Sequence, residues 1–487
     1  MVSVLSASVN VTTHKFFING KWKESSSQQT IEIYSPYSLD LIGRVQAITR
    51  EEIDEAISFA QEAQKTWKEV SLQERATYLY QWANELIGMQ DEIAEVIMKE
   101  VGKSLKDAKS EVARTADLIR YTVEEALHMH GESMKGDSFP GGSKSKVAII
   151  ERVPLGVVLA IPPFNYPVNL AAAKLAPALI SGNAVIFKPA TQGTISGIKM
   201  IEALHKAGLP KGLVNLVTGR GSVIGDYLVE HKGINMISFT GGTNTGTQLA
   251  KKAAMIPLVL ELGGKDPGIV CEDADLQEAA KQIISGAFSY SGQRCTAIKR
   301  VLVHEGVANE FLEILKQEVE RLSVGSPEEG STVVPLIDTG SADFVQGLIE
   351  DALEKGATLV TGNKREDNLI YPTLLDHVTV DMRVAWEEPF GPVLPVIHVS
   401  SDEEAIRLAN ESEFGLQASI FTKDINRAFA IANQIEAGSV QINGRTERGP
   451  DHFPFIGVKG SGMGAQGVRK GLESMTREKV TVLNLTK

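Results

Sequence analysis

Residues 288–300 read FSYSGQRCTAIKR and contain Cys295, one of only two cysteines in the chain. A thiolate is a strong nucleophile, and a nearby cation or a helix N-terminus lowers the pKa of a thiol. Arg294 directly precedes this cysteine, and Glu261 lies upstream in an apolar segment followed by Gly263 and Gly264. We therefore predict that Cys295 is the nucleophile of an active site and that Glu261 handles the proton.

A structural role for each cysteine is the competing interpretation. Free cysteine is more often a small buried apolar residue than a catalyst. Cys271 fits that role because it ends the apolar run 267–271, whereas the neighbours of Cys295, such as Gly292 and Gln293, are not core residues. The local sequence alone leaves both roles of Cys295 open.

Composition limits the class of protein. A chain of 487 residues is too long for one core, so two or three domains are expected. The net charge of −12 argues against nonspecific binding to nucleic acid. Two cysteines without a CxxC motif exclude a disulfide scaffold and a zinc ribbon, so no metal is expected.

Location and membrane association are predicted from the same data. A cysteine that must stay reduced indicates a cytoplasmic protein. Residues 1–10 have neither a basic region nor a long apolar core, so we expect no signal peptide there. Apolar runs elsewhere are too short to span a bilayer, and no membrane partner is expected.

Strand and helix patterns alternate after a hairpin at residues 16–22 and a helical region from 51 to about 130. Expected strands are 156–161, 183–187, 214–217 and 235–239, with helices at 168–180 and 194–207 between them. A second series begins near Gly263, with strands at 298–303, 357–360, 393–399 and 419–421. This alternation predicts parallel sheets covered on both faces, with ligands at the carboxyl ends of the strands.

The C-terminal residues 480–486 alternate with period two but have no partner strand nearby in the sequence. We expect them to complete a sheet elsewhere, in this chain or in a partner subunit.

Two glycine-rich loops follow expected strands and open expected helices. The first contains Gly219, Gly221 and Gly225, one residue longer than the dinucleotide fingerprint, and the second contains Thr240, Gly241 and Gly242. Either loop alone fits a simple turn, but backbone N–H groups at such positions can hold a pyrophosphate. Two of them in consecutive units favour a dinucleotide site.

Lys188 and Thr191 at the end of another strand indicate which dinucleotide binds. NAD sites normally offer a carboxylate to the adenosine 2′-hydroxyl, and that carboxylate would repel a 2′-phosphate. Residues 188–201 contain no Asp or Glu, while Lys188 and Thr191 are potential donors. The cofactor is therefore predicted to be NADP.

Taken together, the motifs resemble those of the aldehyde dehydrogenase superfamily over essentially the whole chain. The matching segments are Pro163–Pro167, Lys188-Pro189, Phe239–Gly241, Glu261–Lys265, Gly292–Cys295, Glu388–Pro392 and Pro454–Gly462. The resemblance implies an α/β fold with a Rossmann-like parallel-sheet cofactor domain, an α/β catalytic domain and a small β oligomerisation arm. The expected extents are 1–137 with 154–262, then 263–455, and 138–153 with 456–487. A homotetramer is expected.

Four longer segments resemble the non-phosphorylating, NADP-dependent glyceraldehyde-3-phosphate dehydrogenases within that superfamily. They are Ala160–Leu170, Ser289–Ala297, Ala385–Pro392 and Arg448–Phe455. The resemblance implies that glyceraldehyde 3-phosphate is oxidised to 3-phosphoglycerate through a cysteine thioester that water resolves. Cys295 is then the nucleophile, Glu261 the base and Asn165 an oxyanion donor.

The same resemblance implies the binding residues. Those expected to hold the phosphorylated aldehyde are Arg114, Tyr166, Arg294, Thr296 and Arg448, and the arginines among them suit a phosphate through forked, charge-assisted bonds. Those expected to hold the cofactor are Pro163, Lys188, Thr191, Gly221, Gly225, Thr240, Gly241, Gly242, Leu262, Glu388 and Phe390, with Glu388 and Phe390 at the nicotinamide ribose and ring.

Three alternatives remain at this point. Arginines alone do not separate a phosphate from a carboxylate, so another anionic aldehyde such as succinate semialdehyde is a candidate substrate. CoA could replace water as the acyl acceptor, although Glu261 argues against this because CoA is itself the nucleophile. A binding protein built on an inactive enzyme scaffold is disfavoured because Cys295, Glu261 and Asn165 are all present.

Overall fold

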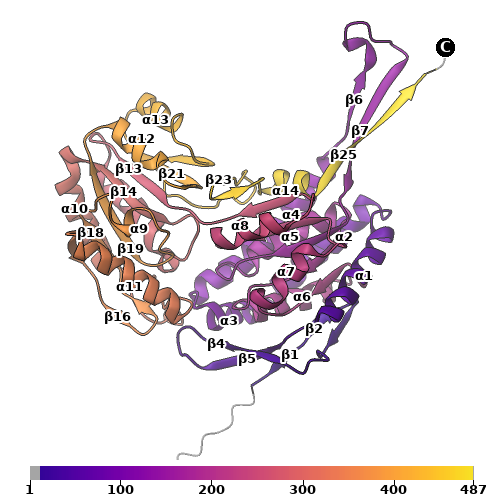
Figure 1. Cartoon of the computed structure of the whole chain (residues 1–487), viewed down its shortest axis with the longest axis horizontal. Helices are drawn as coiled ribbons and strands as arrows, with labels where there is room; N and C mark the ends of the chain where they lie inside the picture. Colours follow the sequence, from indigo (N-terminus) through magenta and orange to yellow (C-terminus); the bar gives the residue numbers. More distant parts are fainter. Residues whose placement is uncertain (1–10, 486–487) are drawn as a thin grey trace, which may run out of the picture.

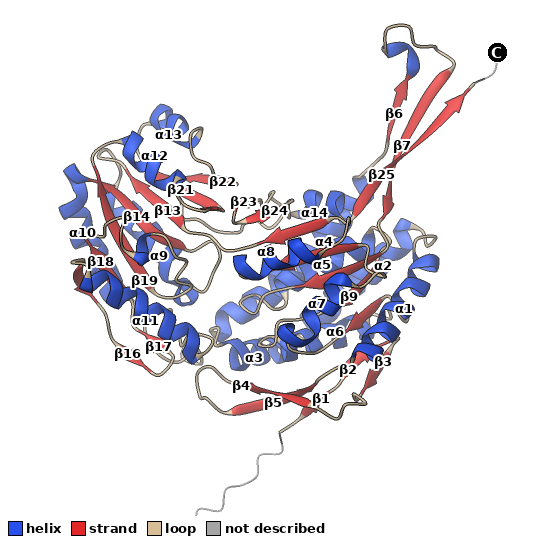
Figure 2. Ribbon diagram, in the orientation of Figure 1, coloured by secondary structure: helices blue, strands red, loops and turns tan. Residues whose placement is uncertain are grey.

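The computed structural model describes residues 11–485, which form two large sheets covered by helices and a projecting three-stranded arm (Figures 1 and 2). The signal-peptide prediction concerns residues 1–10 and lies outside the described residues. Within the described range, no helix is both long and apolar enough to cross a membrane.

The first large sheet has eight strands in the order β24-β12-β11-β8-β9-β10-β2-β3. Their bounds are β2 (Phe16–Ile18), β3 (Lys21–Lys23), β8 (Val157–Ile161), β9 (Ala184–Phe187), β10 (Val214–Leu216), β11 (Met236–Thr240), β12 (Leu258–Glu261) and β24 (Gly462–Met463). Strands β8 to β12 are parallel to one another. The chain proceeds from β8 to β9 and β10 on one side, then crosses to β11 and β12 on the other. Connections therefore diverge at β8, where open α/β sheets form a ligand crevice.

Helices cover this sheet on both faces. They are α1 (Arg50–Trp67), α2 (Leu72–Gly88), α3 (Gln90–Val101), α4 (Leu105–His128), α5 (Asn169–Ile180), α6 (Thr194–Lys206), α7 (Gly221–Glu230) and α8 (Thr243–Lys252). Strands β8, β9, β10 and β11 are buried at every residue, which explains their continuous apolar sequences. One apolar core runs through the sheet and its helices. The predicted parallel, doubly covered sheet is confirmed.

The second large sheet has seven strands in the order β15-β18-β19-β14-β13-β21-β22. Their bounds are β13 (Asp266–Val270), β14 (Ile298–His304), β15 (Thr358–Thr361), β18 (Thr373–Asp376), β19 (Val393–Val399), β21 (Gln417–Phe421) and β22 (Ser439–Ile442). It packs against α9 (Leu276–Phe288), α10 (Glu305–Glu320), α11 (Thr339–Glu354), α12 (Asp402–Asn410) and α13 (Ile425–Ala432), with two apolar cores of its own. Only a few residues separate β12 of the first sheet from β13 of the second, so Glu261 lies where the two halves meet.

The smaller elements complete the chain. A three-stranded sheet contains β1 (Thr13–His14), β4 (Thr30–Tyr34) and β5 (Leu41–Gln46), and two short pairs join β16 (Arg365–Glu366) to β17 (Leu369–Ile370) and β20 (Phe414–Gly415) to β23 (Val458–Lys459). Helix α14 (Val468–Ser474) and the 3₁₀ turns η1 (Gly136–Ser138), η2 (Ser289–Gly292) and η3 (Arg383–Ala385) are the remaining helical segments.

The arm contains β6 (Glu132–Lys135), β7 (Lys146–Pro154) and β25 (Thr476–Asn484), and it projects away from the two sheets (Figure 1). Strand β25 pairs antiparallel with β7, with Val480 opposite Ile150. The expected late strand therefore completes a sheet within this chain. Its outward side chains include Val480 and Val482, each more than half exposed.

Most expected strands and helices agree with the structure to within one or two residues at each end. The predicted domain boundaries stay a prediction. The short strand β24 is placed in the first sheet, beside β12, although its sequence follows the second sheet.

Candidate active site

The loop that carries Cys295 lies between η2 and β14 and has an unusual backbone. Tyr290 and Ser291 both adopt left-handed conformations, with φ of 53° and 56°. Such conformations persist only when their surroundings fix them. Here the Ser291 hydroxyl donates to the carbonyl of Val334 (2.6 Å) and accepts from its N–H (2.7 Å), and the Tyr290 hydroxyl donates to the carbonyl of Val101 (2.6 Å). The position of Cys295 is therefore held from both halves of the chain.

Lys299 connects the loop that carries Cys295, called the nucleophile loop after the predicted role of this residue, to Glu388. Its buried ammonium donates to the backbone carbonyl of Cys295 and lies 3.1 Å from a carboxylate oxygen of Glu388. The same Glu388 oxygen accepts from the Gly264 N–H at 3.1 Å. Glu388 and the nucleophile loop thus share one cation.

The environment of Cys295 makes its thiol a weaker acid than that of a free cysteine. Burial raises its pKa to about 11, and the principal group that opposes this rise is the Lys299 ammonium. Arg294 donates instead to the backbone carbonyl of Gly286. Lys299, and not the adjacent Arg294, is therefore the cation that acts most on the thiol pKa.

Glu261 ends β12 as a buried carboxyl group. Both of its side-chain oxygens lack a hydrogen-bond partner among the described residues. Burial raises its pKa to about 8, while Arg448 and Lys174 act in the opposite direction. Lys174 is itself buried, donates to the Thr240 hydroxyl at 2.7 Å, and has its pKa lowered by burial to about 7. A buried carboxyl group whose pKa lies near neutrality can accept and return a proton.

Asn165 lies in the loop between β8 and α5, at the point where the sheet connections diverge. Its side-chain amide donates to the Gln293 carbonyl at 2.9 Å, which brings it to the nucleophile loop. One Glu111 oxygen accepts from the Val168 and Asn169 N–H groups at 3.0 and 3.1 Å and so fixes the start of α5. The three predicted catalytic residues are thus placed around the same loop.

Two cavities meet at Cys295, which lines both of them together with Leu170 and Thr240. The larger, of about 580 Å³, includes every residue predicted to hold the cofactor. The smaller, of about 300 Å³, includes Arg114, Tyr166, Arg294, Thr296 and Arg448, as well as Glu261. The structure therefore separates the two predicted residue sets into two cavities that share Cys295.

The larger cavity fits a dinucleotide. A Cβ added to Gly221, Gly225 or Gly242 would meet open space, so these glycines leave room at the N-terminal turns of α7 and α8 where phosphate oxygens could accept backbone N–H bonds. Lys188 is buried at its edge, and burial lowers the pKa of this lysine to about 8. A bound polyanion would offset that cost.

Thr191 lies at the boundary between this cavity and a third one of about 750 Å³, whose lining includes the exposed Arg220. Sequence reasoning treated Arg220 only as part of a glycine loop. The structure brings its cation into the cavity that Thr191 borders.

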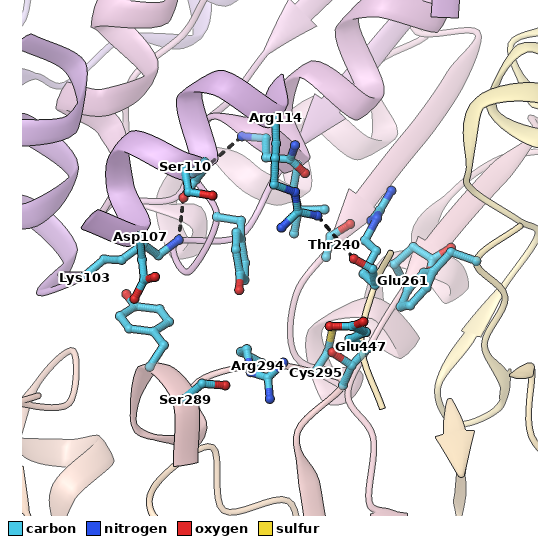
Figure 3. A pocket seen from close by; sticks show the side chains of 18 of the residues that line it. Lys103, Asp107, Ser110, Arg114, Thr240, Glu261, Ser289, Arg294, Cys295 and Glu447 are labelled. Atoms are coloured by element: carbon cyan, nitrogen blue, oxygen red, sulfur yellow. Dashed lines mark hydrogen bonds and ion pairs between the residues drawn. The ribbon is translucent and has the colours of Figure 1, made fainter. Parts of the chain in front are cut away.

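The smaller cavity is rich in charge (Figure 3). Arg114 reaches it from α4, Ser289 and Arg294 lie across from it, and Cys295 and Glu261 lie at one end. Its lining also includes charged residues that sequence reasoning missed, namely Lys103, Asp107, Glu111, Arg445 and Glu447. Of these five residues, only Arg445 and Glu447 had a signal in the sequence, because they lie beside Arg448.

Arg114 enters the cavity with one edge of its guanidinium already engaged. Its Nε and one terminal nitrogen donate to the two Asp451 oxygens, the closest contact being 2.9 Å. The same terminal nitrogen donates to the backbone carbonyl of Arg448 at 3.3 Å. Arg114 therefore also fixes the loop that carries Arg448.

Comparison with known proteins agrees with this geometry. Residues 22–481 match the model of the aldehyde dehydrogenase family. The NADP-dependent glyceraldehyde-3-phosphate dehydrogenase of Streptococcus equinus is 53% identical, over 97% of this chain and 99% of the relative. The protein of the same name from Pisum sativum is 51% identical, over 99% of this chain and 97% of the relative.

A crystal structure gives the same result. The NADP-dependent glyceraldehyde-3-phosphate dehydrogenase from Bacillus halodurans C-125, complexed with NADP, superposes with a TM-score of 0.96 at 60% identity, covering 97% of this chain and 100% of that one. The chain belongs to the aldehyde dehydrogenase family.

Proposed function

We propose that this chain oxidises D-glyceraldehyde 3-phosphate to 3-phosphoglycerate with NADP, and that water releases the product without any orthophosphate. The observation that carries this proposal is the junction at Cys295 of a cofactor cavity and a cavity lined by arginines. The relatives with half or more of their residues identical are NADP-dependent glyceraldehyde-3-phosphate dehydrogenases. Geometry and similarity thus support the same reaction.

Acylation begins at the sulfur of Cys295. As the S–C bond to the aldehyde carbon forms, the thiol proton passes to Glu261, whose free oxygens and near-neutral pKa suit this role. The carbonyl oxygen becomes an oxyanion that the Asn165 amide and the Cys295 N–H stabilise. Comparable donors each contribute about 3–4 kcal/mol to the transition state.

Release of the acid depends on Glu261. When bound, NADP supplies the acceptor of the two electrons whose loss converts the thiohemiacetal into a thioester. Glu261 first releases the thiol proton to solvent and then removes a proton from water as the water oxygen bonds to the thioester carbon, and the C–S bond breaks to free the carboxylate product. Proton transfer to the sulfur restores the thiol of Cys295.

NADP is held by the residues around the larger cavity. Lys188 and Thr191 line this cavity and would donate to the adenosine 2′-phosphate, and no acidic residue occurs between positions 188 and 201. Glu388 and Phe390 lie near Cys295 in the same cavity, where they would hold the nicotinamide ribose and ring.

We also propose that the chain forms a homotetramer and that it is located in the cytoplasm. The arm exposes apolar side chains, including Met134, Phe139, Val480 and Val482, which another copy could cover. A reduced Cys295 requires a reducing compartment.

The reaction itself is tested with glyceraldehyde 3-phosphate and NADP in buffer free of inorganic phosphate. We expect NADPH formation at 340 nm and 3-phosphoglycerate as the product, because water is the acyl acceptor. Cys295→Ser should reduce the rate by at least about a thousandfold while NADP still binds. A dependence on orthophosphate, or a variant with normal turnover, would rule out this mechanism.

Deacylation should depend on the ionisation of Glu261. Its pKa is raised from 4.5 to about 8, so the ionised base is the minor form at neutral pH. The single-turnover deacylation rate should therefore rise about tenfold per pH unit up to pH 8 and level off above it. Glu261→Gln should give one burst of NADPH and then stop. A rate that is flat between pH 6 and 8 would show that another group is the base.

Cofactor preference should change at Thr191. A carboxylate there would repel the 2′-phosphate, so Thr191→Glu should raise the KM for NADP by at least about tenfold and that for NAD much less. Thr191→Gln provides a matched uncharged control of the same size. Equal effects of the two substitutions would mean that size, and not charge, sets the preference.

Arm packing is tested by replacing two exposed residues on β25. The double variant Val480→Glu, Val482→Glu should give a smaller species than the wild type in light scattering, because four or more carboxylates would be buried between copies. Phe429→Glu on α13, which is 56% exposed and away from the arm, serves as control. A monomeric wild-type chain would exclude the proposed tetramer.

A further inference from the structure

The cationic side chains that line the smaller cavity fall into two groups. Three of them pair with a carboxylate: Lys103 with Glu111, Arg114 with Asp451 at 2.9 Å, and Arg445 with Glu447 at 2.7 Å. Across residues 11–485, neither Arg294 nor Arg448 forms an ion pair with a carboxylate. Among the described residues, these two guanidinium groups are therefore the only cations of the cavity without an acidic partner.

Within residues 11–485, the side chain of Arg448 is held by uncharged groups. One of its terminal nitrogens donates to the side-chain oxygen of Gln466 at 2.9 Å, and its guanidinium lies 5.0 Å from the centre of the Phe455 ring. Gln466 and Phe455 face each other across a β-bridge, with backbone bonds of 2.8 and 3.0 Å in both directions. Both are buried, with 4% and 6% of their surface exposed. The bridge thus forms a rigid, neutral support for one arginine.

The chemistry at Gln466 requires an acceptor but not a charge. A guanidinium has only donors, so the amide must turn its oxygen toward Arg448 and its NH₂ group away. That NH₂ group is buried and has no hydrogen-bond partner within residues 11–485. Glutamate has the same shape and a better acceptor, and it would satisfy the arginine without leaving an unpartnered donor. With glutamine at this position, the positive charge of Arg448 has no negative partner beside it. The cost is that the buried NH₂ group of Gln466 makes no hydrogen bond within residues 11–485.

We infer that Gln466 is a positioning residue that determines substrate specificity: its neutral amide orients Arg448 while leaving the full guanidinium charge available to the phosphate of the substrate. This inference rests on the proposed function. Two uncompensated guanidinium groups match the two negative charges of a phosphate dianion, whereas a carboxylate would neutralise only one of them. An aldehyde that carries a phosphate is therefore favoured over one that carries a carboxylate.

Arg448 also affects the base. It is the principal group that opposes the effect of burial on the pKa of Glu261. A carboxylate at position 466 would partly cancel the field of Arg448, so the pKa of Glu261 would rise further. The pH dependence of deacylation therefore reports on the charge of Arg448 separately from any change in packing.

The test compares Gln466→Glu, which adds a charge at constant shape, with Gln466→Met, which keeps the length and adds none. The measured quantity is the ratio of kcat/KM for glyceraldehyde 3-phosphate to kcat/KM for unphosphorylated glyceraldehyde, in which changes to the shared chemistry cancel. Gln466→Glu should lower this ratio by at least about tenfold, and Gln466→Met by less than about threefold. Only the glutamate variant should move the midpoint of the deacylation pH profile to higher pH.

Several outcomes would overturn the inference. Equal kcat/KM ratios for Gln466→Glu and the wild type would show that the neutral amide is not what keeps the charge of Arg448 available to the substrate. A tenfold fall of this ratio in Gln466→Met would show that the hydrogen bond to Arg448 matters and that the added charge does not. Gln466→Met therefore still tests the inference if Gln466→Glu fails to fold. A wild-type chain that prefers the unphosphorylated aldehyde would contradict the proposed function itself, which is a different result.

Discussion

The buried ion pair between Lys103 and Glu111 is the contact on which the geometry of the site depends. Both side chains are almost fully buried. The same carboxylate accepts two backbone N–H bonds at the start of α5, and the ammonium lies 3.6 Å from the ring centre of Tyr166 and 5.0 Å from that of Tyr290. Removing either partner would leave an uncompensated buried charge, at a cost of about 3–5 kcal/mol. One pair thus joins the α3–α4 corner, the Asn165 loop and the nucleophile loop.

The second constraint is the burial of the reacting groups. Burial raises the pKa of Cys295 to about 11 and that of Glu261 to about 8, so the ionised form of each is the minor one at neutral pH. Under the proposed mechanism, each group therefore exchanges a proton during the reaction and does not carry a permanent charge. Lys299 contributes by fixing the Cys295 carbonyl and Glu388 together, which couples the nucleophile loop to the cofactor cavity.

Sequence reasoning predicted the elements of the fold well because their signals are local. Continuous apolar runs such as Val157–Ile161 specify a buried parallel strand without knowledge of the partner strands. Glycine loops after two other runs mark the turn from a strand to its helix. Period-two alternation at residues 480–486 showed a strand but not its partner, since β7 lies more than 300 residues earlier in the chain. Pairing over such distances has no signal in a single sequence.

The same distinction applies to the site. Motifs such as those around Glu261 and Cys295 identified part of the lining of both cavities, yet they did not show which charges are paired. Arg294 is adjacent to Cys295 in sequence but donates to Gly286, and Arg114 meets Asp451 more than 300 residues away. Partners of this kind depend on side-chain direction and on tertiary contacts, so the charge state of the cavity could be known only from the structure.

The distribution of charge also bears on why water, and not orthophosphate, resolves the thioester. Only Arg294 and Arg448 lack an acidic partner around this cavity among residues 11–485, and the phosphate of the substrate would already occupy them. An incoming orthophosphate dianion would then find no uncompensated cation, and it would approach Glu261 in the ionised form that deacylation requires. At short range in a closed site that repulsion is large. Water is neutral and small, and it can give its proton to the same carboxylate, so the arrangement that binds one phosphate excludes a second.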